Sequence, residues 1–188
     1  MNRSNKPSCR TTIALALALA GSAILTGCGE ALAPVREPPL AGADIGGEFA
    51  LTGSKGQTVR WSDFAGRYRV VYFGYTFCPD ICPTDMQRVA QALKQLKASD
   101  PDKAGRIVPL FISVDPARDT PEKVGEFARA FSDDVIGLTG SPEAIAAAAK
   151  AFKVYFGKGE ALAGGGYLVD HTNIVYLFGP QGEPLATL

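Results

Sequence analysis

The most constraining feature of the sequence is an apolar run that leads directly into two cysteines and then a helical pattern. Arg69–Tyr75 (RVVYFGY) consists largely of β-branched and aromatic residues, which predicts a strand buried on both faces of a sheet. Cys78 and Cys82 follow in FCPDICPT, and apolar residues recur at helical spacing from Met86 to Leu96. A cysteine pair between a central strand and its helix is typical of a thioredoxin-like α/β sandwich.

The remaining predicted elements surround this unit. They are an N-terminal hairpin (Phe49–Thr52 and Thr58–Trp61), a second central strand (Ile107–Val114), a short strand (Val135–Leu138) and a closing hairpin (Asn173–Phe178 and Pro184–Leu188). Thr120 and Ser141 each precede Pro-Glu, which predicts two capped helices. Pro109 weakens the prediction for the first half of its strand. The sequence therefore predicts a central mixed sheet with flanking helices.

The cysteines and the chain's only histidine, His171, are candidate metal ligands. A thiol at a helix start faces unpaired N–H groups that stabilise the thiolate, and Pro83 places this start at or just before Cys82. The spacing of i and i+4 lets both sulfurs share a metal or close a disulfide. Two thiolates and one imidazole suit Cu(I) without a fourth ligand, whereas zinc would need one from water or Asp80.

The surroundings of His171 suggest how it reaches the cysteines. It stands in VDHT, just before the last hairpin, where a thioredoxin-like sheet would place it beside the cysteine loop. Asp80 and Asp170 are candidates to orient the imidazole or tune the thiolates. The stretch Gly157–Gly166 (GKGEALAGGG) has no packing pattern and predicts a mobile loop, which we hypothesise lets His171 approach or leave the metal.

The N-terminus has the layout of a secretory signal. Residues 1–10 carry three basic and no acidic residues, and 11–25 are almost wholly apolar. The order Leu25, Thr26, Gly27, Cys28 resembles the lipobox of bacterial lipoproteins, which implies a signal over 1–27 and a lipidated Cys28. Residues 28–46 then form a tether and 47–188 a single domain, exported and lipid-anchored to a bacterial membrane, facing the periplasm or cell exterior. An ordinary signal peptide or an uncleaved anchor is the alternative.

The net charge argues against two classes of partner. The chain has 19 basic and 19 acidic residues, and removing the signal takes away three basic residues only, which leaves a net charge of about −3. A mildly acidic domain is a poor candidate for binding nucleic acid or anionic membrane surfaces.

Four segments together resemble the Sco/SenC family, the copper chaperones for cytochrome c oxidase assembly. They are YFGYTFCPDICPTD, FISVDPARDTP, GLTG and YLVDHTNIVYLFGPQG, in matching order and spacing over Gly46–Leu188. The resemblance implies a thioredoxin-like fold and one copper ion bound by Cys78, Cys82 and His171. It also implies delivery to the binuclear copper A site of cytochrome c oxidase subunit II, directly or with assembly factors, and reduction of that subunit's disulfide. Family members usually continue into a further helix, which this sequence, ending at Leu188, does not contain.

Two other functions stay open at this point. A membrane-tethered thiol-disulfide oxidoreductase would need only the cysteines, although VDHTN lacks the proline that general thioredoxin-like reductases carry before the last hairpin. A structural or sensory lipoprotein would keep the pair as a permanent disulfide, as an oxidising compartment favours. DPARDTP (Asp115–Pro121) is interpreted as a turn into a capped helix rather than a ligand site.

Overall fold

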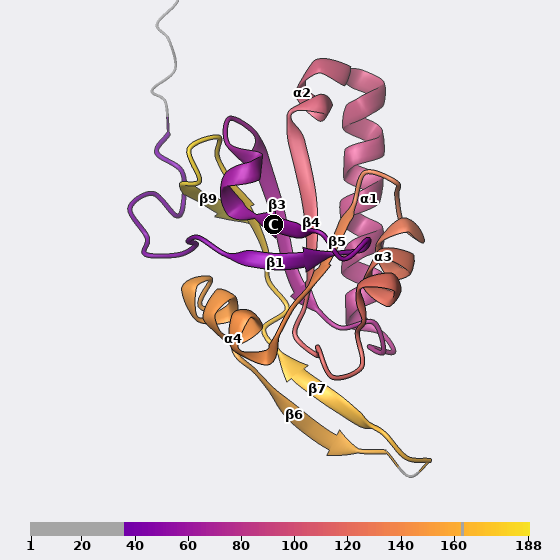
Figure 1. Ribbon diagram of the computed structural model, residues 1–188. Helices are drawn as coiled ribbons and strands as arrows, with labels where there is room; N and C mark the ends of the chain where they lie inside the picture. The colour runs from indigo at the N-terminus through magenta and orange to yellow at the C-terminus, as the bar shows by residue number, and fades with distance from the viewer. Residues whose placement is uncertain (1–35, 163) are drawn as a thin grey trace, which may run out of the picture. The chain divides into compact units, whose positions relative to one another are not determined.

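The computed structural model describes residues 36–162 and 164–188 (Figure 1). The predicted signal segment, Cys28 and the first part of the predicted tether lie outside the described residues. Within the described ranges, no helix has both the length and the apolar character needed to cross a membrane.

A mixed seven-stranded sheet forms the centre, in the order β2-β1-β5-β4-β3-β8-β9. Its strands are β1 (Ala50–Gly53), β2 (Thr58–Arg60), β3 (Tyr68–Gly74), β4 (Ile107–Ser113), β5 (Ile136–Thr139), β8 (Val175–Phe178) and β9 (Pro184–Thr187). The central strands β3, β4 and β5 are parallel, whereas the other pairings are antiparallel. The predicted mixed sheet and both predicted hairpins are confirmed.

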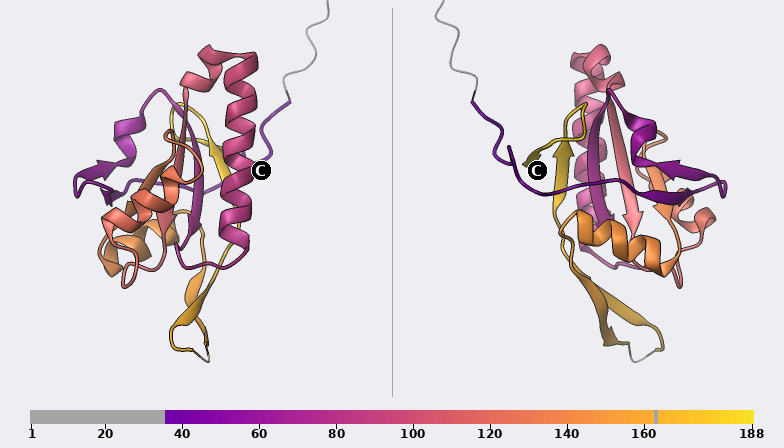
Figure 2. Two further views of the ribbon diagram at one scale, coloured as in Figure 1. Left: turned by 90° about the vertical axis from the view of Figure 1, so that its right-hand side faces the viewer. Right: turned by 60° about the vertical axis from the view of Figure 1, so that its left-hand side comes forward.

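Helices cover both faces of this sheet (Figures 1 and 2). They are a 3-10 turn η1 (Trp61–Phe64), α1 (Ile81–Ser99), the short α2 (Pro101–Gly105), α3 (Pro121–Arg129) and α4 (Pro142–Ala151). On the face of α1 and α3, Tyr72 stacks on Phe111 with ring centroids 6.5 Å apart. On the face of α4 and η1, Phe73 packs on Phe152 at 5.4 Å. Because successive residues of β3 are buried on opposite faces, the strand is apolar or aromatic from Val70 to Phe73. This is the predicted thioredoxin-like arrangement.

The prolines and caps lie where backbone chemistry tolerates them. Thr120 and Ser141 cap α3 and α4, each with its hydroxyl oxygen accepting from a backbone N–H of the first turn. Pro109 lies inside β4, opposite Val70 of β3. Its position is one residue before the pairing of β4 with β5, which begins at Leu110.

The predicted loop over Gly157–Gly166 is wrong for its first half. β6 (Phe156–Ala161) and β7 (Tyr167–His171) form a separate two-stranded antiparallel sheet that projects from the body (Figure 1). A Cβ atom on Gly157 would lie 3.0 Å from the Tyr155 hydroxyl oxygen, and one on Gly159 would lie 3.0 Å from an Asp170 carboxylate oxygen. The glycines therefore allow close approach within a strand rather than mobility.

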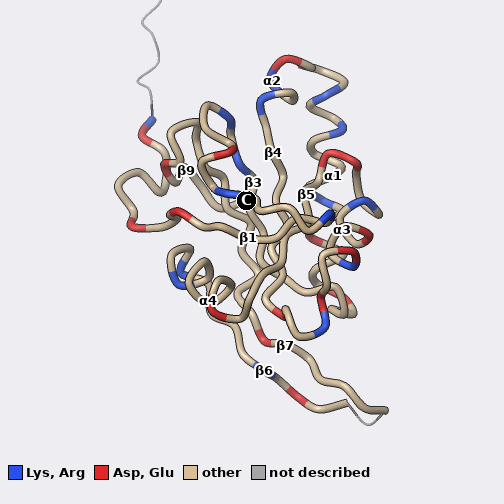
Figure 3. Tube along the Cα trace, in the orientation of Figure 1, with Lys and Arg blue, Asp and Glu red and all other residues tan. Residues whose placement is uncertain are grey.

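The end of the predicted tether lies against the domain. The N–H of Leu40 donates to the carbonyl of Leu185, and that of Gly46 donates to the carbonyl of Ala151, both at 3.0 Å. Leu40 and Ile45 also pack against the core. Along the described chain, basic and acidic residues are interspersed rather than gathered by sign (Figure 3).

Candidate metal centre

Three side chains from different parts of the chain meet at one end of the parallel strands. Cys78 lies in the loop after β3, Cys82 in the first turn of α1, and His171 at the end of β7. One ligand atom from each lies within 4.8 Å of the other two. These residues adjoin an open cleft of about 390 Å³, which Cys78 and His171 line. The structure thus brings together the three residues that the sequence singled out.

The hydrogen bonds of His171 fix which ring nitrogen is available. Nδ1 lies 3.0 Å from the carbonyl oxygen of Thr172, and Nε2 lies 3.3 Å from the Cys82 sulfur. Because a carbonyl only accepts, Nδ1 carries the proton and Nε2 presents its lone pair to the sulfurs. Burial lowers the pKa of His171 below its ordinary value, which favours the neutral imidazole that a metal requires. The rings of Tyr72 and Tyr75 flank the imidazole nearly at right angles.

The two thiols differ in exposure and in hydrogen bonding. The N–H of Cys82 donates to the Cys78 sulfur at 3.3 Å, so Cys78 is the thiol that receives a hydrogen bond from the helix start. Cys82 itself is fully buried, and burial raises the pKa of this thiol well above its usual range. At Cys82, the cost of burying a charge therefore exceeds the stabilisation by the N–H groups at the start of α1. This is contrary to the expectation of a stabilised thiolate. A bound cation would reverse this balance, because metal ligation requires the thiolate.

The two aspartates predicted to support the site lie at its rim. Asp80 is exposed at the N-cap of α1 and makes no side-chain capping bond. Asp170 is exposed and adjoins His171 on β7, where successive side chains point to opposite faces. Both line the cleft, but among the described residues neither carboxylate hydrogen-bonds to the cysteines or to His171.

Two residues beside the sulfurs escaped the sequence analysis. Asp85 is 8% exposed and lies three residues after Cys82, on the same face of α1. Burial is the main cause that raises the pKa of Tyr72, and the neighbouring Cys82 and Asp85 raise it further. The helical spacing of Asp85 from Cys82 could have identified it, whereas nothing in the β3 pattern distinguishes Tyr72 from its neighbours.

The DPARDTP segment does more than cap a helix. The Asp119 carboxylate is 1% exposed and accepts three hydrogen bonds: from the Thr76 N–H at 2.9 Å, the Thr76 hydroxyl at 2.6 Å and the Ser113 hydroxyl at 2.6 Å. Thr76 stands two residues before Cys78, so Asp119 holds the start of the cysteine loop. The predicted turn and capped helix are confirmed, but this contact could not be inferred from local spacing.

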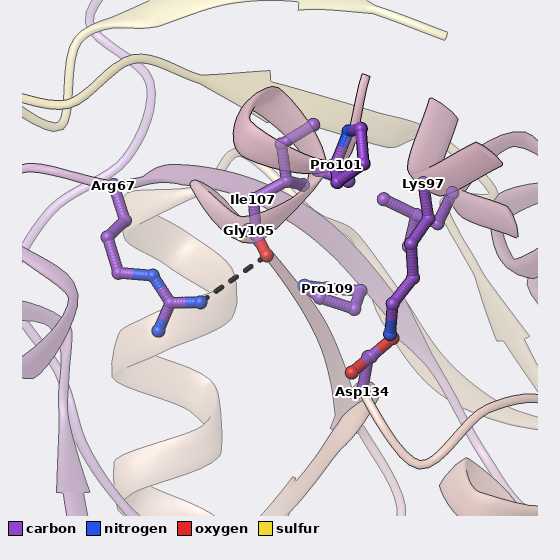
Figure 4. A pocket seen from close by; sticks show the side chains of 9 residues that line it. Arg67, Lys97, Pro101, Gly105, Ile107, Pro109 and Asp134 are labelled. Carbon is purple, nitrogen blue, oxygen red and sulfur yellow. Dashed lines mark hydrogen bonds and ion pairs between the residues drawn. The ribbon is translucent and has the colours of Figure 1, made fainter. Parts of the chain in front are cut away.

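Another hollow lies at the opposite end of the parallel strands (Figure 4). It has a volume of about 220 Å³, and its charged lining groups are satisfied within the chain. Arg67 donates to the carbonyl of Ile107 at 3.5 Å, and Lys97 pairs with Asp134 at 3.5 Å. No thiol or imidazole lines it, so the chemistry of the described chain is concentrated at the cysteine end.

The comparisons with known proteins agree with this geometry. The family model described as SCO1/SenC matches residues 37–188. The mitochondrial SCO1 homolog 1 of Arabidopsis thaliana is 43% identical over 148 residues, which cover 78% of this chain and 43% of that protein. A crystal structure of Arabidopsis thaliana ScoI with copper bound superposes with a TM-score of 0.71 at 40% identity, covering 77% of this chain and 87% of that one. Bradyrhizobium japonicum ScoI with copper bound gives 0.70 at 34% identity, covering 77% and 88%.

The chain spans about half the length of the curated relatives, for example 43% of the Arabidopsis protein and 48% of the mouse SCO1 homolog. The similarity nevertheless includes the sheet, the cysteine loop and the hairpin that carries His171. With a family model matching nearly every described residue and a shared fold at up to 40% identity, this chain belongs to the SCO1/SenC family.

Proposed function

We propose that this chain is a copper-binding metallochaperone that acts in cytochrome c oxidase assembly. The observation that carries the proposal is the mutual distance of at most 4.8 Å between one ligand atom each of Cys78, Cys82 and His171. Soft thiolates with one imidazole form a donor set that copper(I) accepts with three ligands. The copper-bound relatives from Arabidopsis and Bradyrhizobium support the choice of metal.

The protein's part in binding is to present these ligands in the correct protonation state. Burial favours the neutral form of His171, and the Nε2 lone pair already faces the Cys82 sulfur, so the imidazole enters the complex without losing a proton. The buried Cys82 thiol gives up a proton when the ion binds, because the cation replaces the stabilisation that water cannot supply there. Copper uptake should therefore release protons, and it should weaken as the pH falls.

The proposed function includes delivery of the copper ion to a recipient protein. We infer that the recipient is the binuclear copper A site of cytochrome c oxidase subunit II, or a factor that loads it. The cleft beside the ligands is open, so a partner's own ligands can reach the ion and replace His171 and Cys78 before the buried Cys82. Ligand exchange of this kind needs no fully solvated copper intermediate.

A second activity, thiol-disulfide exchange on the same recipient, is favoured by the difference between the two cysteines. Both thiols are free, and Cys78 is the one whose sulfur accepts the helix N–H. The Cys78 thiolate would attack a disulfide sulfur of the partner, and the partner's other sulfur would leave as a thiolate. Cys82, after losing its proton, would then displace the first sulfur. The chain ends with one disulfide, and the partner ends with two thiols.

The proposed location rests on the sequence alone. We propose that residues 1–27 are a signal peptide and that Cys28 carries the lipid that anchors the domain to a bacterial membrane, facing the periplasm or the exterior. Metabolic labelling with a fatty acid tests this anchor. The label should be present on the wild-type protein and absent from Cys28→Ala.

The central experiment measures Cu(I) affinity by competition with a chromogenic chelator, using reduced protein. Cys78→Ser, Cys82→Ser and His171→Ala should each bind copper at least about tenfold more weakly, because each removes one of three ligands. Asn173→Ala is the matched control, since Asn173 is exposed on the same cleft without being a ligand. Unchanged affinity in His171→Ala would refute the three-ligand site, and full reductase turnover in that variant would favour the oxidoreductase.

A further inference from the structure

The hairpin that carries His171 depends on the rest of the domain for its position. β6 and β7 pair only with each other and share no ladder with the seven-stranded sheet. A lone two-stranded hairpin is marginally stable in water, so its side chains must hold it in place. The metal site therefore needs a contact that docks β7 beside the cysteine loop.

Arg118 makes several contacts with the far end of β7. Its guanidinium carbon lies 3.7 Å from the ring centroid of Tyr167, and its Nη1 donates to the Tyr167 carbonyl at 2.9 Å. Its Nε pairs with the carboxylate of Asp115, which also accepts the Tyr167 hydroxyl at 2.7 Å. Asp115 is 5% exposed, so this ion pair is largely shielded from water. Arg118, Asp115 and Tyr167 thus form a closed set of interactions between the turn and the hairpin.

The same guanidinium also reaches the cysteine loop. It lies 4.9 Å from the ring centroid of Phe77, the residue before Cys78, and 5.7 Å from that of Tyr75. Meanwhile Asp119, the next residue along the turn, holds Thr76. The turn that contains Arg118 therefore contacts both segments that carry metal ligands.

Tyr167 and His171 lie on the same face of β7, so the position of one affects that of the other. Tyr167, Val169 and His171 alternate along the strand and share one face, the face that meets the cysteine loop. Val169 between them is buried. A displacement of Tyr167 by the loss of its partner would therefore move His171 relative to the sulfurs.

We propose that Arg118 is a positioning residue that docks β7 and so sets the distance between His171 and the two cysteines. Arg118 does not touch the metal ligands, and its effect on copper passes through His171. The copper part of this inference rests on the proposed three-ligand site.

The first test uses the copper-free protein and measures hydrogen exchange. Arg118→Gln should increase exchange of the β6 and β7 amides by about tenfold while the central sheet stays protected. Lys123→Gln is the matched control: its ammonium lies at the same 4.9 Å from the Phe77 ring and donates to the Arg118 carbonyl, but none of its hydrogen bonds or ring contacts within the described residues reaches β7. Equal hairpin exchange in wild type and Arg118→Gln would overturn the proposal.

The second test is a double-variant cycle on Cu(I) affinity. Arg118→Gln should weaken binding about tenfold in the wild-type background and leave it unchanged in the His171→Ala background. An equal loss in both backgrounds would show a general structural effect and overturn the proposal. Should His171→Ala itself not weaken binding, the proposed metal site fails, while the copper-free exchange result still decides the docking role.

Arg118→Lys keeps these tests decisive if Arg118→Gln does not fold. Lysine keeps a charge beside Asp115 but cannot also donate to the Tyr167 carbonyl while lying flat on its ring. A cooperative thermal transition together with faster hairpin exchange and weaker copper binding than in wild type supports the proposal. Wild-type values for both measurements in Arg118→Lys would overturn it.

Discussion

Asp119 offers the sharpest test of how the cysteine loop is held. Its buried carboxylate accepts from the Thr76 N–H, the Thr76 hydroxyl and the Ser113 hydroxyl, and it joins the loop after β3 to the end of β4. Asp119→Ala leaves these donors without a partner in a site that water reaches poorly. Asp119→Asn keeps one oxygen for the two donors that share Oδ2, and its new amide N–H can donate to the Thr76 hydroxyl.

The magnitudes follow from this count of hydrogen bonds. A hydrogen bond to a charged group contributes roughly 1.5–3 kcal/mol, and the contributions are not fully additive, so Asp119→Ala should lower the free energy of unfolding by about 4 kcal/mol. Asp119→Asn loses mainly the negative charge that strengthens these hydrogen bonds, so it should lower the free energy of unfolding by about 1–2 kcal/mol. With about 2–4 °C per kcal/mol in a domain of this size, Asp119→Ala should lower the Tm by about 8–16 °C.

Thermal and urea unfolding of the reduced, copper-free protein measure both variants. Asp133→Ala is the control, because this aspartate is exposed and has no hydrogen-bond partner for its carboxylate in the described part of the chain. If Asp119→Ala unfolds within about 1 kcal/mol of wild type, the three hydrogen bonds do not hold the loop as argued. If Asp119→Asn is as destabilised as Asp119→Ala, the argument from shared donors is wrong.

Two further predictions concern pH and packing. Burial lowers the pKa of His171 in the folded state. As the pH falls below about 6.5, the imidazole therefore becomes protonated in the unfolded chain before it does so in the folded one. The copper-free wild type should therefore lose stability from that pH down to the lower pKa of the folded state. In thermal melts at different pH, His171→Gln should lose less stability over this range. Equal dependence of Tm on pH in the two proteins would contradict this. Gly137→Ala should destabilise the fold by roughly 3 kcal/mol or more, because the new Cβ would meet the Val124 carbonyl oxygen on α3. A Tm equal to that of wild type would show that α3 can shift freely.

The sequence was most informative where a repeating pattern carries the information. The continuous apolar run in β3, the apolar spacing of α1 and the Pro-Glu caps of α3 and α4 depend on neighbours in the chain, so the strand and the starts of the three helices were predicted close to where they are observed. The meeting of His171 with the cysteines was predictable once the fold class was known, because the topology decides which segments share an end of the sheet.

What the sequence did not reveal depends on contacts between distant segments. The glycines of β6 resembled a loop because the contact that explains Gly159, the close approach of the Asp170 carboxylate, comes from the partner strand. Arg118 and Asp119 looked like ordinary turn residues, since Tyr167 and Thr76 lie 49 and 43 positions away. Such side-chain pairs have no period and leave no local signal.

The separation of the ligands between two sheets has a practical consequence for redesign. The thiolates belong to the body of the domain, whereas the imidazole sits on a hairpin with its own internal hydrogen bonds. The tip of that hairpin is exposed and rich in glycines, of which Gly165 and Gly166 have positive φ, so it is a natural site for inserted residues or a spectroscopic label. Hairpin length can therefore be varied at the tip and the donor at position 171 while the sulfurs stay in place, which makes the third ligand an adjustable element of the protein's metal preference.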